Sequence, residues 1–226
     1  MKQFFIISLV LCACALSAAA QGKVSVADMQ KQIAASPAKK TLTATFDEKA
    51  NRSTVATTHF ILGRNDVIQQ SDGSTQSFGT SVPTWDVIVR SVFETDTISQ
   101  PLGEFAWVVN VYNPRFPQDA ELVIKADADT LTFKPSKVGR LNTSNVKVSD
   151  GSFQQDKTQD MIQNNSGNMA DSAKPLYFAF VLTRDDMAKI SKATKIRISL
   201  TKQLDNTMQK DMKGSIDTML AITDVH

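Results

Sequence analysis

The chain has 226 residues, with 25 lysines and arginines against 23 aspartates and glutamates, so its formal net charge at pH 7 is +2. A balance this close to zero argues against nucleic acid or an anionic membrane surface as an electrostatic partner. There are two histidines, and the two cysteines, Cys12 and Cys14, lie near the N-terminus. This composition excludes thiol catalysis and a thiolate or His-rich metal site in the remaining chain, and we predict no metal and no cofactor.

The N-terminus has the three parts of a secretory signal peptide. Lys2 supplies the positive start, Phe4–Leu11 forms the apolar run, and Ala18–Ala20 places small side chains where a signal peptidase cleaves. We therefore predict a signal peptide over residues 1–20 and a single exported β-rich domain over residues 21–226. The expected location is the periplasm, the cell surface or the outside of the cell.

The same segment contains a second processing pattern. Leu11–Cys14 resembles the cleavage box of bacterial lipoproteins, in which Cys14 would carry lipid and anchor the protein to a membrane. Cleavage after Ala20 is favoured, because the Ala-Ala-Ala site is the cleaner of the two. After the signal, no stretch approaches the ~20 apolar residues that a membrane-spanning helix requires.

The first element expected after the signal is a short helix. Ser25 followed by Asp28 has the form of a capping box, and Val26, Met29 and Ile33 share one helical face. The helix is expected to end near the dipeptide at residues 36–37, which contains a proline.

From Leu42 the apolar residues alternate with period two, and threonine, valine and aromatic residues become frequent, which is typical of β-strands. The expected strands are Leu42–Phe46, Thr54–Leu62, Trp85–Phe93, Phe105–Tyr112, Glu121–Ala126 and Thr130–Lys134. Phe105–Val109 is apolar on both faces and is expected in the middle of the structure. The polar turn Asp127–Asp129 predicts a hairpin, and Val146 and Val148 indicate a further strand.

The predicted strand Trp85–Phe93 shows how such a sheet divides its two faces. Its apolar face carries Trp85, Val87, Val89 and Phe93, and its other face carries Asp86, Arg90 and Glu94. We expect the second face to contact water.

The C-terminal part is predicted to form a strand, a helix and another strand. Leu176–Leu182 is strongly apolar, Thr183–Asp186 is a second capping box that starts a helix running to about Ala193, and Lys195–Thr201 alternates. The two strands are either parallel neighbours joined by a short crossover or members of different sheets between which the chain passes. Apolar residues from Leu204 to Leu220 have helical spacing and predict a docked amphipathic helix.

Two polar segments, Asn65–Thr84 and Gly151–Pro175, interrupt this regular pattern. Long loops without structure of their own are uncommon in compact domains and are often functional. These segments are the regions that we nominate for recognition, with mobile polar loops that bind nothing as the alternative.

The sequence contains no recognisable catalytic set. His59 lies in a predicted strand and His226 is the last residue, so neither forms a dependable Ser-His-Asp site, and no Gly-x-Ser-x-Gly elbow is present. Carboxylate pairs of the kind used by glycoside hydrolases are Asp47 with Glu48, Glu94 with Asp96, Asp127 with Asp129, and Asp185 with Asp186. Turns and helix N-termini explain these acids better, so we assign no catalytic, cofactor-binding or metal-binding residue.

These patterns predict a mainly β fold: an antiparallel β-sandwich-like core with a short helix between the last two strands and helices at the ends of the exported domain. An α+β arrangement is the alternative. The predicted function is that of an exported, non-enzymatic protein that binds an unidentified protein or envelope component or has a structural role.

Two other functions remain open. A small-ligand or glycan-binding module requires aromatic rings such as Trp85 or Tyr112 to be exposed beside a polar loop. A hydrolase that uses a carboxylate pair requires two acids roughly 5 to 10 Å apart in a cleft.

Overall fold

The computed structural model describes residues 22–69, 75–140 and 174–225. The predicted signal peptide, which contains Cys12 and Cys14, lies outside the described residues. The strand expected at Val146 and Val148 and most of the polar segment Gly151–Pro175 are also outside them.

The larger sheet has seven strands, in the order β10, β11, β7, β5, β3 and β2, with β4 also paired to β5. Their bounds are β2 Leu42–Asp47, β3 Arg52–Thr57, β4 Phe60–Gln69, β5 Thr75–Glu94, β7 Glu104–Val111, β10 Lys137–Arg140 and β11 Leu176–Thr183. All these pairings are antiparallel. The central place of β7, between β11 and β5, confirms the prediction drawn from its two apolar faces.

A smaller sheet contains four antiparallel strands in the order β13, β12, β8 and β9. Their bounds are β8 Leu122–Ala126, β9 Asp129–Phe133, β12 Ile196–Leu200 and β13 Leu204–Thr207. A two-stranded ladder joins β1 (Val24–Ser25) to β6 (Thr97–Ile98). The fold is therefore mainly β and sandwich-like, with antiparallel sheets, as predicted.

The described residues also contain the helices α2 (Val26–Ala35), α4 (Arg184–Lys192) and α5 (Lys210–Ile222). In this part of the chain, no helix has the length and apolar character needed to span a membrane.

Helix α4 carries the chain from one sheet to the other, because β11 belongs to the larger sheet and β12 to the smaller one. This arrangement selects the second of the two alternatives considered for the strand–helix–strand unit. The predicted capping box is present: the backbone N–H of Asp186 donates to Thr183 Oγ1 (3.2 Å), and the backbone N–H of Thr183 donates to Asp186 Oδ2 (3.0 Å).

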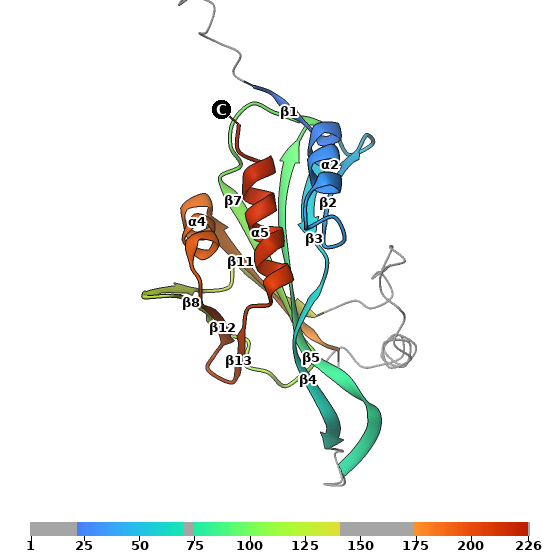
Figure 1. The fold of residues 1–226 in the computed structure, drawn as a ribbon. Helices are drawn as coiled ribbons and strands as arrows, with labels where there is room; N and C mark the ends of the chain where they lie inside the picture. Colours follow the sequence, from blue (N-terminus) through green and yellow to red (C-terminus); the bar gives the residue numbers. More distant parts are fainter. Residues whose placement is uncertain (1–21, 70–74, 141–173, 226) are drawn as a thin grey trace, which may run out of the picture.

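Both sheets contribute to one hydrophobic cluster. On β7 the alternate residues Phe105, Trp107 and Val109 are fully buried, as are Ile198 of β12 and Met212 of α5. Figure 1 shows α2 and α5 side by side in front of the larger sheet, with α4 next to them. The core thus lies between the larger sheet on one side and the helices and smaller sheet on the other.

Two predictions for the first half of the chain were wrong. The expected strand Thr54–Leu62 is divided into β3 and β4, which pair with successive parts of β5. The polar segment Asn65–Thr84 is mostly strand, not loop, because β4 and β5 continue as an antiparallel ladder in which Val67 pairs with Ser77. A ladder of this kind uses backbone N–H and C=O groups, so it forms without the apolar alternation that marks a buried strand.

The helix predicted from Leu204 onward begins only at Lys210, because residues 204–207 form β13. Thr201 and Lys202 have φ values of 49° and 60°, and these left-handed conformations turn the chain back on β12. Leu200 then pairs with Leu204. Strand pairing therefore overrides the helical spacing of the apolar residues.

Candidate functional site

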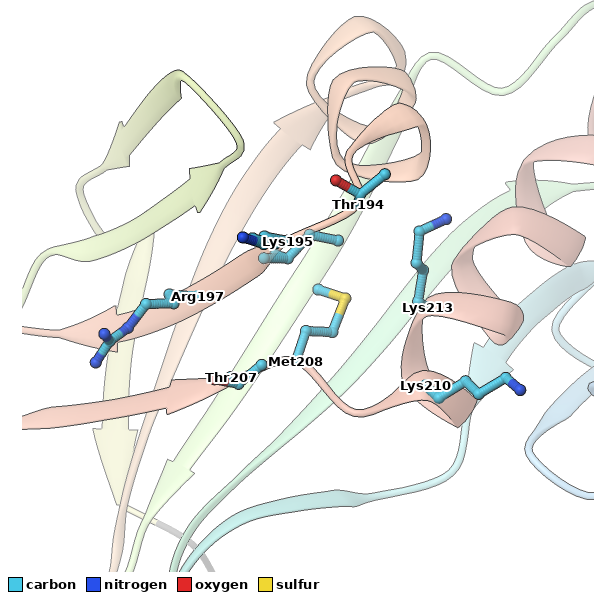
Figure 2. Close-up of a pocket in the computed structure, with 8 residues that line it drawn as sticks. Thr194, Lys195, Arg197, Thr207, Met208, Lys210 and Lys213 are labelled. Carbon is cyan, nitrogen blue, oxygen red and sulfur yellow. The ribbon is translucent and has the colours of Figure 1, made fainter.

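A pocket of about 430 Å³ lies where β12 and β13 meet the N-terminal end of α5 (Figure 2). It is lined by Thr194, Lys195, Ile196, Arg197, Thr207, Met208, Lys210 and Lys213, and we call it the basic pocket. The hairpin between β12 and β13 creates it by returning the chain to the start of β12. A volume of this order is typical of small-ligand sites.

The floor of the basic pocket is apolar. Ile196 and Met208 are 4% and 8% exposed, and the backbone N–H of Met208 donates to the carbonyl of Ile196 at 2.9 Å. Alternation along β12 explains this placement, because Ile196 faces the core while Lys195 and Arg197 on either side of it are exposed.

Two of the four cations around the pocket are neutralised by neighbouring carboxylates. Arg197 makes a bidentate pair with Asp205, with distances of 3.2 Å from Nε to Oδ1 and 2.6 Å from Nη2 to Oδ2. Lys213 Nζ lies 2.9 Å from Asp217 Oδ2 and donates to the carbonyl of Ser191 at 2.6 Å. The Arg197–Asp205 pair joins β12 to β13, and Lys213 joins α5 to the end of α4.

The other two cations, Lys195 and Lys210, are exposed and make no hydrogen bond or ion pair through their ammonium groups within the described residues. They lie on opposite sides of the pocket, Lys195 on the side of the sheet and Lys210 on α5, and their side chains point away from each other (Figure 2). The pocket therefore has an apolar centre with an exposed lysine on each side, and the carboxylate of Asp127 lies near Lys195 and interacts with its charge.

The N-terminus of α5 adds to this positive character. Gln209 is the N-cap residue, but its side chain makes no cap hydrogen bond and instead donates through Nε2 to the carbonyl of Ile61 (2.5 Å). The N-cap side chain therefore satisfies none of the first backbone N–H groups of α5, where the helix dipole places a partial positive charge that Asp211 in the first turn partly offsets.

A second polar cluster is buried in the larger sheet. Asp86 is 2% exposed, and its carboxylate accepts from Asn110 Nδ2 (2.7 Å) and from the hydroxyl of Tyr112 (2.5 Å). His59 Nδ1 lies 3.2 Å from the same carboxylate. Burial, and then the charge and hydrogen bond of Asp86, raise the pKa of Tyr112 well above its ordinary value.

This cluster was missed by sequence reasoning. Alternation put Asp86 on a wet face, and His59 was assigned to a strand, whereas it lies in the break between β3 and β4. The only sequence signal was the return of polar residues at Asn110 and Tyr112 at the end of an apolar strand. The cluster exists because strand register places Asp86 opposite Asn110.

Two acids of the predicted carboxylate pairs, Asp47 and Asp127, accept backbone hydrogen bonds in turns. Asp47 Oδ1 accepts from the backbone N–H groups of Lys49 and Ala50, which closes the turn after β2. Asp127 accepts from the backbone N–H groups of Thr194 and Lys195, and these bonds, that of Thr194 first, lower its pKa. Among the described residues, no group of three or more His, Cys, Asp or Glu side chains is arranged to hold a metal ion.

The aromatic rings considered for glycan binding face inward. Trp85 and Trp107 are fully buried, and the hydroxyl of Tyr112 is directed at Asp86. Trp85 and Tyr112 therefore offer no exposed platform for a sugar, which removes the support that the glycan-binding alternative required.

Comparison of the chain with known protein families, with curated proteins and with solved structures finds no match.

Proposed function

We propose that this chain is an exported, non-enzymatic binding protein, that the basic pocket is its binding site, and that its ligand is anionic. The observation that carries the proposal is the pair of exposed lysines, Lys195 and Lys210, on either side of a pocket whose floor is formed by the apolar Ile196 and Met208.

A purely structural role does not account for this arrangement. Arg197 and Lys213 connect neighbouring elements through Asp205 and Asp217. Within the described residues, Lys195 and Lys210 make no ion pair of this kind, although the charge of Lys195 acts on Asp127, and both side chains are exposed to an incoming anion. The sites where solvent meets both apolar and charged side chains are those that proteins commonly use for recognition.

A non-enzymatic role is supported by the chemistry of the acids and of the described histidine. The carboxylate of Asp86 is occupied by contacts with His59, Asn110 and Tyr112. The carboxylate of Asp127 is occupied by a hydrogen bond from Thr194, in the link between α4 and β12. Export is proposed from residues 1–20 alone, on the pattern described above.

The proposal is tested by thermal unfolding of the exported protein with inorganic phosphate, citrate and poly-glutamate as probes. A probe at 100 times its dissociation constant adds roughly 2.7 kcal/mol of stability. At about 2 to 4 °C per kcal/mol, the midpoint should rise by several degrees with at least one of them.

The double variant K195E/K210E should lose this rise. Its matched control is K39E/K40E, which makes the same change of net charge at two exposed lysines outside the pocket lining and should keep the rise. Equal loss in both variants, or no rise with any probe, would contradict the proposal.

A further inference from the structure

The shape and charge of the basic pocket narrow the class of its ligand. A compact oxyanion is held by donors that converge on one point. Here the two exposed ammonium groups diverge, since Lys195 points away from α5 and Lys210 points away from the smaller sheet (Figure 2). One small anion cannot contact both groups, whereas an extended ligand with two separated negative charges can.

The centre of the pocket favours a ligand that carries an apolar group. Between the two lysines, a ligand meets the buried floor of Ile196 and Met208. Methionine is unbranched and flexible, so Met208 can adapt to side chains of different shape. A ligand that places an apolar side chain here gains from the surface it removes from water.

The lining also discriminates among polyanions. None of its residues is aromatic, so nucleic acid bases have no ring on which to stack. The formal net charge of +2 is far from that of a nucleic-acid-binding chain. Carboxylates suit the site better, because they can pair with Lys195, with Lys210 and with the uncapped N-terminus of α5.

Resting on the proposed function, we infer that the ligand is an extended polypeptide segment of a partner protein, in which an apolar side chain is flanked on both sides by acidic residues. The apolar side chain occupies the floor of the basic pocket, and the acidic residues reach Lys195 on one side and Lys210 on the other. Two carboxylates and one apolar group, in that order along an extended chain, are the recognition element.

The test measures binding of three fluorescent peptides of equal length by anisotropy, with the full exported protein. The first peptide alternates aspartate and leucine, the second replaces each leucine by serine, and the third replaces each aspartate by lysine. Burial of one leucine predicts that the first peptide binds about tenfold or more tightly than the second. Charge predicts that the third does not bind.

The protein is varied in parallel. K195E/K210E should weaken binding of the first peptide by about tenfold or more, and K39E/K40E should leave it unchanged, because exposed charge pairs act mainly at short range. Raising the salt concentration from about 0.05 M to about 0.5 M should weaken binding of the first peptide to the unmodified protein. Circular dichroism checks that each variant is folded, and the peptide series gives an answer with the unmodified protein alone.

The outcomes separate this inference from the proposed function. If phosphate or citrate stabilises the protein but the first and second peptides bind equally, the pocket binds anions and the inferred peptide ligand is wrong. If no anionic probe and no peptide binds, both the proposed function and the inferred peptide ligand are wrong. Preferential binding of the first peptide, lost in K195E/K210E alone, supports both.

Discussion

At the scale of single residues, Asp86 is the least expected feature of the molecule. A carboxylate that is 2% exposed is stable only if its oxygens are well supplied with donors. Asn110 and the hydroxyl of Tyr112 provide them, and Tyr112 lies in the chain immediately after β7, where the ladder to β5 ends. The cluster thus links β5 to the C-terminal end of β7 through side-chain hydrogen bonds.

Replacement of Tyr112 by phenylalanine removes one of these donors. We expect Y112F to lower the free energy of unfolding at pH 7 by about 1 to 3 kcal/mol, the cost of an unsatisfied buried polar group. The control Y177F removes the hydroxyl of a half-buried tyrosine that makes no hydrogen bond to the described residues through that hydroxyl, and it should change stability little. Urea denaturation of both variants measures the difference.

The pH dependence of the same pair has a definite sign. The pKa of Tyr112 is raised in the folded protein, so the neutral form is favoured there. Its contribution to stability is therefore complete below the ordinary value of 10.0 and is lost as pH rises above it. The stability gap between the unmodified protein and Y112F should shrink above pH 10, and a constant gap would contradict this account.

At the scale of elements, Arg184 joins the beginning of α4 to the end of α5. Its Nη2 donates to the carbonyl of Leu220 (2.9 Å) and lies 3.1 Å from Asp224 Oδ1, and its Nη1 donates to the carbonyl of Thr223 (3.3 Å). A cation at the C-terminus of a helix also complements the negative end of the helix dipole. One side chain therefore satisfies the carbonyls of Leu220 and Thr223 at the C-terminal end of α5.

Removal of this side chain should loosen the docking of α5. We expect R184A to cost about 1.5 to 3 kcal/mol, the range for hydrogen bonds to charged groups. R184K should recover only part, because an ammonium group lacks the planar fork of donors. R197A, which breaks an exposed arginine–carboxylate pair, should cost no more than about 1 kcal/mol. A cost for R184A as small as that of R197A would refute the docking role.

At the scale of the whole molecule, the two sheets and three helices share one buried cluster within the described residues. The tryptophans of the described part, Trp85 and Trp107, are both in the larger sheet. Their fluorescence reports on that sheet alone, whereas circular dichroism reports on the whole chain. Because the core is continuous, we expect both probes to give one coincident denaturation transition.

A substitution in the smaller sheet makes this prediction sharper. Ile198 is fully buried in β12, and I198A should cost about 2 to 5 kcal/mol. If the molecule unfolds as one unit, tryptophan fluorescence of the larger sheet shifts to the same lower midpoint. V92A, at a valine that is 48% exposed, should lower the free energy of unfolding by less than about 0.5 kcal/mol and leave the midpoint almost unchanged. A separate early transition for the smaller sheet would show two independent units.

Most element types were predictable from the sequence because their causes are local. The capping pairs at Ser25 and Thr183 act within three residues, and both helices begin where those pairs place them. The alternation along β12 reflects a buried and a more exposed face, and β7 is apolar on both faces, so each strand was identified from its own residues. The hairpin around Asp127 needed only a short turn between two such strands.

Apart from the hairpin around Asp127, only the tertiary structure decided which elements meet. Residues 204–207 have the spacing of a helix, yet they form a strand, because the turn at Thr201 and Lys202 brings them to the edge of β12. The basic pocket follows from that turn, and the Asp86 cluster follows from the register of β5 against β7. Local patterns determine what a segment can become, since they depend on neighbours a few residues away. Sites depend on pairing between distant segments, whose free energy is set by packing and by the strand register of the complete fold.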